Sequence, residues 1–135
     1  MEQSDAVRDG MLAFYERFSA GDAEAFANGI ATCDGVSVIG SGPGEGHGDR
    51  DSWLHAYATQ IGAMGIRLEG GDDPVGYEEG TVGFGTDTPR FVLQDGSYVP
   101  TRMTAVLRQE GGEWKIVHLH FSVGVGDEDA VQSPD

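Results

Sequence analysis

The chain has 135 residues, 39% of them hydrophobic, which suits a single domain built around one core. Its 23 acidic residues against 8 basic ones give a formal net charge of -15, a balance that repels a phosphate backbone and excludes nucleic acid as an expected partner. No apolar stretch reaches the length of a membrane span, and the N-terminal MEQSDAVRDG has neither the basic region nor the apolar run of a secretory signal. We therefore expect a cytoplasmic protein without a membrane partner.

Two helices are predicted in the first thirty residues. From residue 4 to residue 20 the apolar side chains recur every three or four positions, which places them on one helical face: Val7, Met11, Phe14 and Phe18. Ser4 or Asp5 is expected to cap the start of this helix, and Gly21 to end it. Asp22 then caps a short second helix that carries Phe26.

A glycine-rich segment separates these helices from a third one. A short strand at residues 36–38 stops at GSGPGEGHG, residues 40–48, which lacks the lysine of a P-loop and the glycine spacing of a dinucleotide fingerprint. We interpret it as a mobile loop at the mouth of a cavity. The third helix is expected to begin at Asp51 or Ser52 and to end at Gly65, with one apolar face made of Trp53, Tyr57, Ile61 and Met64.

The remainder of the chain predicts strands, at residues 66–69, 80–86, 90–94, 98–108 and 113–123, with tight turns at residues 95–96 and 111–112. Helices followed by antiparallel strands indicate an α+β domain, a curved sheet with the helices on one face. The last two strands are apolar on both faces, so the second face needs a partner, and we expect a homodimer formed through the sheet. We place this single domain at residues 1–123 and expect a disordered acidic tail at residues 124–135.

Three stretches of the sequence carry a family resemblance: FYERFSAGDAEAF, VSVIGSGPG followed by DSWLHAY, and TRMTAVLRQEGGEWKIVHLHFS. They resemble the SnoaL-like branch of the nuclear-transport-factor-2-like superfamily, in the same order, from about residue 5 to residue 123. The last strand is also similar to the association domain of calcium/calmodulin-dependent kinases. The resemblance implies a cone-shaped domain, in which a strongly bent antiparallel (mixed) sheet is covered by three helices around a pocket, commonly as a dimer.

The same superfamily contains isomerases, cyclases, dehydratases, epoxide hydrolases and members that only bind or assemble, so the resemblance leaves the chemistry open. Its known enzymes use an aspartate as base with a tyrosine or a second acid as partner, and we match none of those positions to this sequence. Asp34 and Asp51 flank the first strand and the third helix, where a pocket opens, but neither has the apolar setting that raises the pKa of a catalytic acid.

Two of the four histidines stand in the last strand, EWKIVHLHFS. Strict alternation places His118 and His120 on one face, with Trp114, Ile116 and Ser122. Two histidines at this spacing can bind a metal only with further ligands, and His47, Glu45 and Asp49 in the glycine-rich loop are the candidates. Because no metal-binding signature accompanies them, we expect no metal and no cofactor.

Two other interpretations of His118 and His120 remain open. In the first, both are wall residues whose ring nitrogens bond to neighbouring groups. In the second, one contacts a ligand or acts as a general acid or base. Arg102, in a largely apolar strand, is the best candidate for contact with an anion, although an acidic neighbour would also satisfy it.

Three aromatic residues complete the set of candidate pocket residues. Tyr15 lies off the apolar face of the first helix, whereas Trp53 and Tyr57 lie on that of the third helix. Each can line a cavity or belong to the core.

We therefore predict that Arg102, Tyr15, Trp53, Tyr57, His118 and His120 surround a pocket for a small, mainly apolar molecule that can carry an anionic group. One alternative is an isomerase, cyclase or hydratase that uses a pocket histidine or aspartate for proton transfer on a small carbonyl or polyketide-like substrate. The other alternative is a dimerisation or assembly module without a ligand.

Overall fold

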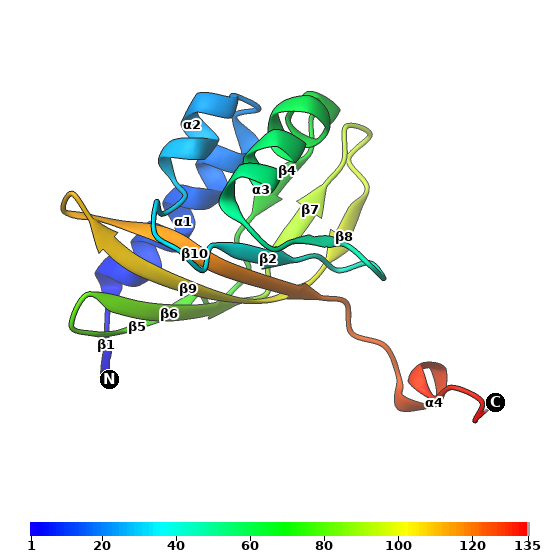
Figure 1. Cartoon of the computed structure of the whole chain (residues 1–135). Coiled ribbons are helices and arrows are strands. Elements are labelled where there is room, and N and C mark those ends of the chain that lie inside the picture. Colours follow the sequence, from blue (N-terminus) through cyan, green and yellow to red (C-terminus); the bar gives the residue numbers. More distant parts are fainter. Residues whose placement is uncertain (135) are drawn as a thin grey trace.

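The structure is a computed structural model that describes residues 1–134, and it has the α+β architecture of a bent sheet with helices on one face (Figure 1). The three helices on that face are α1 (Asp5–Ser19), α2 (Ala23–Asn28) and α3 (Arg50–Ala56). Helix α3 continues into a π turn, η1 (Tyr57–Ile61), and a 3-10 turn, η2 (Gly62–Met64). A fourth helix, α4 (Asp127–Ala130), lies in the C-terminal segment, away from the body of the domain.

Within the described residues, ten strands form two sheets. The large mixed sheet has the order β1-β5-β6-β9-β10-β2-β3, and the small one the order β4-β7-β8. The strands of the large sheet are β1 (Glu2–Gln3), β2 (Ser37–Ile39), β3 (Gly46–His47), β5 (Val75–Glu79), β6 (Val82–Asp87), β9 (Arg102–Glu110) and β10 (Glu113–Ser122). Those of the small sheet are β4 (Arg67–Glu69), β7 (Arg90–Val92) and β8 (Tyr98–Pro100). Only β2 and β10 pair in parallel among these strands.

The helix ends follow the expected capping chemistry, with one shift. The Ser4 and Asp22 side chains accept hydrogen bonds from the backbone N–H groups of Val7 and Glu24 at 3.1 and 3.0 Å. Helix α3 begins earlier than predicted, because Asp49 caps it by accepting from the N–H of Ser52 at 2.8 Å. The π and 3-10 turns then break the 3.6-residue period, so Met64 is 56% exposed and does not share the apolar face with Trp53.

The predicted strands differ from the observed strands for physical reasons. The segment 98–108 divides into β8 and β9, because Thr101 turns away from both ladders and donates from its N–H and its hydroxyl to the Pro89 carbonyl, at 3.0 and 2.7 Å. Strand β5 was not predicted, because a glycine and two glutamates are residue types that are uncommon in strands.

The strict alternation predicted for β10 is wrong at Val117. The register with β9 shifts between Ile116 and His118, which marks a β-bulge. Ile116 is buried on the helix-facing side of the sheet, and beyond the bulge Leu119 and Phe121 lie on that same side. His118 and His120 point to the opposite, outer face. The bulge therefore places Ile116 and the histidines on different faces, although their spacing is even.

Helix α1 packs directly on glycines of the sheet. The buried Val7 and Met11 rest on Gly83 and Gly85 of β6, where an added Cβ would lie 2.8 Å from each side chain. At Gly76 of β5 an added Cβ would lie 2.6 Å from the backbone nitrogen of Arg8. The absence of side chains at these positions allows the helix to approach the sheet closely.

The predicted C-terminal boundary of the domain lies close to the end of the last strand. Strand β10 ends at Ser122, next to the predicted boundary at residue 123. The tail predicted as disordered, residues 124–135, contains α4, and its last residue lies outside the described residues, so the disorder stays a prediction. None of the helices in residues 1–134 has both the length and the apolarity needed to cross a membrane.

We predict that Gly76→Ala destabilises the protein by about 1–3 kcal/mol, because the new methyl group overlaps backbone atoms of α1 that have no room to move. Thermal unfolding followed by circular dichroism measures this as a fall in Tm of about 4 °C per kcal/mol. Gly48→Ala is the matched control, since a Cβ at Gly48 meets no atom within 4 Å. Equal Tm values for the two variants would contradict the close packing.

Candidate functional site

Three hollows are found in the surface formed by residues 1–134. The largest, here called the helix-side cleft, has a volume of about 590 Å³ and lies between the helices and the bent sheet. The second, here called the outer groove, has a volume of about 550 Å³ and lies at the ends of β6, β9 and β10. The third, of about 260 Å³, lies between α1 and the turn that joins β9 to β10.

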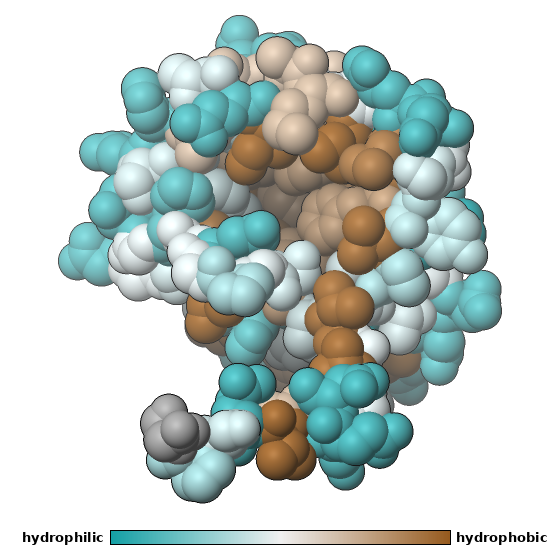
Figure 2. Space-filling view, turned by 90° about the vertical axis from the view of Figure 1, so that its right-hand side faces the viewer, coloured by the Kyte–Doolittle hydropathy of each residue, from teal (hydrophilic) through white to brown (hydrophobic). Residues whose placement is uncertain are grey.

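Apolar side chains form most of the wall of the helix-side cleft. Figure 2 shows its mouth as a hollow surrounded by hydrophobic residues. The apolar wall consists of Phe14, Phe18, Val38, Trp53, Ala56, Ile61, Ile66, Phe91, Leu93, Val99, Leu119 and Phe121. The polar side chains of the lining are Ser41, Glu45, His47 and Gln60. Such a surface holds a ligand mainly by apolar contact and orients it through a few polar groups.

The glycine-rich segment contributes one wall of the cleft. It connects β2 to β3, and its hairpin is held by a hydrogen bond from the Gly40 N–H to the Glu45 carbonyl at 3.1 Å and one from the Glu45 N–H to the Gly42 carbonyl at 3.2 Å. Residues of this loop line the cleft from Gly40 to His47. The segment thus occupies the position expected from the sequence, at the mouth of a cavity.

Of the predicted pocket residues, Trp53 is the one that lines the helix-side cleft. It is 4% exposed and packs edge-on against Phe26, with ring centroids 5.5 Å apart. Tyr57 lies behind it in the core, stacked on Phe26 at a centroid distance of 3.9 Å, and its hydroxyl donates to the Phe18 carbonyl. Burial raises the pKa of Tyr57. Tyr57 therefore belongs to the core behind the cleft and does not line it.

The side chain of Tyr15 contacts a buried acid, Asp87, that was not among the predicted site residues. Its hydroxyl donates to Oδ2 of Asp87 at 2.9 Å, and Asp87 is only 6% exposed. Asp87 also accepts from the N–H groups of Gly71 and Thr88, at 3.1 and 2.8 Å. Burial, followed by the negative charge of Asp87, raises the pKa of Tyr15 far above its ordinary value of 10.0. One signal could have found Asp87: it alternates with Gly83 and Gly85 on the helix-facing side of β6.

Arg102, His118 and His120 lie on the outer face of the sheet and not in the cleft. The Nδ1 atom of His118 is 2.8 Å from the hydroxyl oxygen of Ser37, on the neighbouring strand β2. Arg102 and His120 line the outer groove, together with Asp73, Thr86, Asp87, Thr88, Met103, Thr104 and Ser122. The expectation that these three residues share a pocket with Trp53 is wrong. The bulge at Val117 turns His118 and His120 to the outer face, and Arg102 faces outward because it alternates with the buried Met103 on β9.

The structure also separates the residues considered as metal ligands. Glu45 and His47 line the helix-side cleft, whereas His120 lines the outer groove. Within residues 1–134 no group of three or more His, Cys, Asp or Glu side chains is close enough to hold a metal ion.

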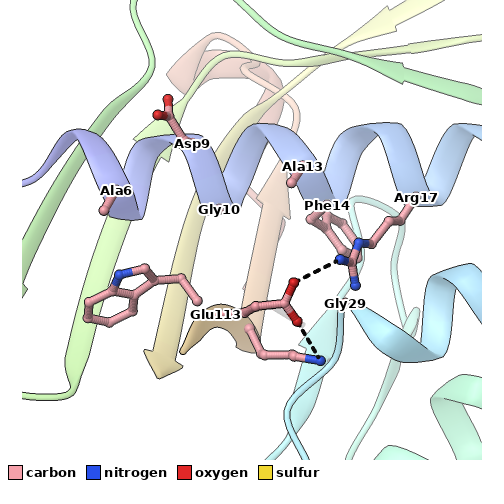
Figure 3. A pocket seen from close by; sticks show the side chains of 10 residues that line it. Ala6, Asp9, Gly10, Ala13, Phe14, Arg17, Gly29 and Glu113 are labelled. Atoms are coloured by element: carbon pink, nitrogen blue, oxygen red, sulfur yellow. Dashed lines mark ion pairs between the residues drawn. The ribbon is translucent and has the colours of Figure 1, made fainter. Parts of the chain in front are cut away.

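The third hollow brings together one face of α1 and the start of β10 (Figure 3). Glu113 lies between two cations, 3.7 Å from an Nη atom of Arg17 and 3.4 Å from Nζ of Lys115. Because both cations are already paired with Glu113 and the volume is less than half that of either other hollow, the helix-side cleft and the outer groove are the stronger candidates for binding.

Comparison with known proteins gives both a family and a fold. Residues 7–126 match the family described as the SnoaL-like domain. Among solved structures, a proposed dehydratase of the NTF2-like family from Streptomyces avermitilis is similar, with 24% identity, a TM-score of 0.75, and coverage of 90% of this chain and 96% of that one. No curated protein matches the sequence.

Two further structures extend the similarity of fold. A proposed scytalone dehydratase from Novosphingobium aromaticivorans has 12% identity and a TM-score of 0.71, with coverage of 89% of this chain and 83% of that one. A proposed calcium/calmodulin-dependent kinase II association domain from Thiobacillus denitrificans has 18% identity and a TM-score of 0.67, with coverage of 86% of this chain and 93% of that one. Both confirm the cone-shaped fold expected from the sequence.

We predict that Tyr15→Phe destabilises the protein at neutral pH by about 1–3 kcal/mol, because the buried Asp87 loses a donor. Since the pKa of Tyr15 is raised in the folded state, its stabilising effect is present below about pH 10 and decreases as the pH rises further. The difference in Tm between wild type and Tyr15→Phe should therefore shrink above about pH 10. Tyr98→Phe, at a 53% exposed residue, is the control. A difference in Tm that is constant across this range would contradict the assignment.

Proposed function

Because this chain belongs to the SnoaL-like family, we propose that it binds a small, mainly apolar molecule in the helix-side cleft. The observation that carries the proposal is the lining of the cleft. Five aromatic side chains, Phe14, Phe18, Trp53, Phe91 and Phe121, surround a volume of about 590 Å³, which is in the range of small-molecule sites. Large apolar surfaces left in contact with water favour a ligand that covers them.

The polar groups of the cleft argue for a neutral ligand. Among the described residues that line it, no arginine or lysine is present, and Glu45 is the one carboxylate. The suggestion of an anionic ligand depended on Arg102, which lies on the outer face. Ser41, His47 and Gln60 remain as hydrogen-bonding groups for a hydroxyl or carbonyl of the ligand.

The enzyme alternative has one candidate group in the cleft. His47 is the imidazole among its described lining residues, so proton transfer on a bound carbonyl compound would depend on His47 and not on His118 or His120. Glu45 precedes His47 by two residues on the glycine-rich loop. It also lines the cleft and supplies a carboxylate. The assembly alternative expects a small or filled cavity, which a cleft of about 590 Å³ does not favour.

We expect Leu93→Asp to weaken binding of the neutral fluorescent dye Nile red about tenfold or more, because a charge at the mouth of the cleft must lose water when the dye enters. Leu93 is 38% exposed, so its replacement leaves the core intact. Met64→Asp is the matched control, an exposed apolar residue that lines none of the three hollows. Fluorescence titration measures both affinities, and equal affinities would exclude the cleft as the site.

We also propose that the outer face of the sheet pairs with a second copy of this chain. Neighbouring strands align a row of apolar side chains there: Tyr77 pairs with Phe84, and Phe84 with Val106. The rings of Tyr77 and Phe84 stack at a centroid distance of 5.3 Å, and Val82 beside them is 51% exposed. In a chain with a net charge of -15, an uncharged row is the part of this face that two copies can bring together without repulsion.

Phe84→Asp should shift the protein from dimer to monomer, because the new carboxylate would be buried at the contact between the uncharged side chains of Tyr77 and Val106 on the neighbouring strands. Sedimentation equilibrium measures the change in mass. Met64→Asp adds the same charge away from this row and should leave the mass of the dimer unchanged. A wild-type protein that sediments as a monomer would contradict the proposal directly.

A further inference from the structure

The outer groove contains the components of an anion site, on the opposite side of the sheet from the helix-side cleft. It opens where β6 and β10 end and β9 begins, beside the point where the C-terminal segment leaves β10 (Figure 1). Its volume is about 550 Å³, and it shares no lining residue with the cleft. The apolar row proposed for pairing lies beside it, one step along the same strands.

Arg102 is the basic group of this groove, and its guanidinium is held in place but not neutralised. Its Nε donates to the hydroxyl of Ser122, on the neighbouring strand, at 3.2 Å. Every other arginine and the lysine of residues 1–134 has a carboxylate or a backbone carbonyl as partner. The terminal nitrogens of Arg102 have no such partner in the part of the chain that the structure describes. They form a fork whose geometry matches the two oxygens of a carboxylate.

The acidic residues of the groove do not satisfy Arg102. Asp87 is buried and already accepts three hydrogen bonds, from the Tyr15 hydroxyl and the N–H groups of Gly71 and Thr88. Asp73 is exposed and makes no ion pair with the described residues. The chain has 23 acidic residues, but one arginine has no carboxylate or carbonyl partner within residues 1–134, and this arginine faces a hollow.

Hydroxyl and imidazole groups complete the surface around Arg102. Across the strands, Thr104 pairs with Thr86 on one side and with His120 on the other. All three are exposed on the same outer face as Arg102. These groups donate hydrogen bonds to an anion and also bond to hydroxyls on the body of a ligand. Met103 is the one apolar side chain among the described lining residues, so an apolar ligand gains little here.

We propose that the outer groove binds the carboxylate of a small, hydroxylated monocarboxylic acid. Arg102 holds the carboxylate, while His120 and Thr104 contact the polar body. A single fixed positive charge balances a single negative one, and the nearby carboxylates of Asp73 and Asp87 disfavour a dianion such as a phosphate ester. This site is independent of the ligand proposed for the cleft.

The test uses the full chain with lactate as the probe and lactamide, of the same size but uncharged, as the comparison. Titration followed by NMR chemical shifts of the backbone amides should give saturable binding of lactate and none of lactamide. Arg102→Gln should weaken lactate binding about tenfold or more, and Arg102→Lys should weaken it by less, since the charge is kept and the fork is lost. The backbone amide spectrum of Arg102→Gln should keep the dispersion of the wild-type spectrum, which shows that the variant is folded.

Arg108→Gln is the matched control. Arg108 lies on the same strand and face as Arg102, but Glu110 pairs with it at 3.5 Å, and it does not line the groove. Lactate should bind this variant as it binds the wild type. Equal weakening in both variants would assign the effect to general electrostatics and overturn the proposal. Binding of lactamide as strong as that of lactate, or no saturable binding of lactate, would overturn it as well.

Discussion

The close approach of α1 to the sheet is the constraint on which the other features of the domain depend. Val7 and Met11 rest on strand positions that have no side chain, and the start of the helix is tied to β5 by a hydrogen bond from the Ser4 N–H to the Gly76 carbonyl at 2.8 Å. Further along the helix, Tyr15 is bonded to Asp87 at the end of β6. These two attachments fix the direction of α1 across the sheet. Its next turns, with Phe14 and Phe18, are thereby placed over the helix-side cleft.

The bulge in β10 has an equally large effect on the chemistry of the surface. Without the additional residue, even spacing would place Ile116 and the two histidines on one face. With it, Leu119 and Phe121 line the cleft while His120 and Ser122 line the outer groove. The sheet therefore separates an aromatic, nearly uncharged cavity from a polar groove that contains an arginine. The bulge contributes to this difference, because it directs the apolar side chains of the end of β10 to the cleft and the polar ones to the groove.

The sequence was sufficient for the features that depend on local patterns. The periodicity of α1, the capping residues Ser4 and Asp22, and the glycine at residue 65 predicted the helices, and the stretch TRMTAVLRQEGGEWKIVHLHFS predicted the family and with it the cone-shaped fold. Features that depend on contacts between distant segments were not predictable in the same way. The bulge at Val117 has no glycine or proline to mark it, and the assignment of His118 and His120 to a pocket with Trp53 failed for that reason. Asp87 was overlooked because its buried partner, Tyr15, lies 72 positions earlier in the chain.

One strand serves both hollows. From residue 119 to residue 122, successive side chains of β10 face the cleft, the groove, the cleft and the groove. Neighbouring codons of a single short stretch of the gene thus encode two chemically different surfaces. A substitution at residue 119 or 121 alters the helix-side cleft, and one at residue 120 or 122 alters the outer groove. The two surfaces can therefore diverge separately among descendants of this protein, while the backbone that carries both stays the same.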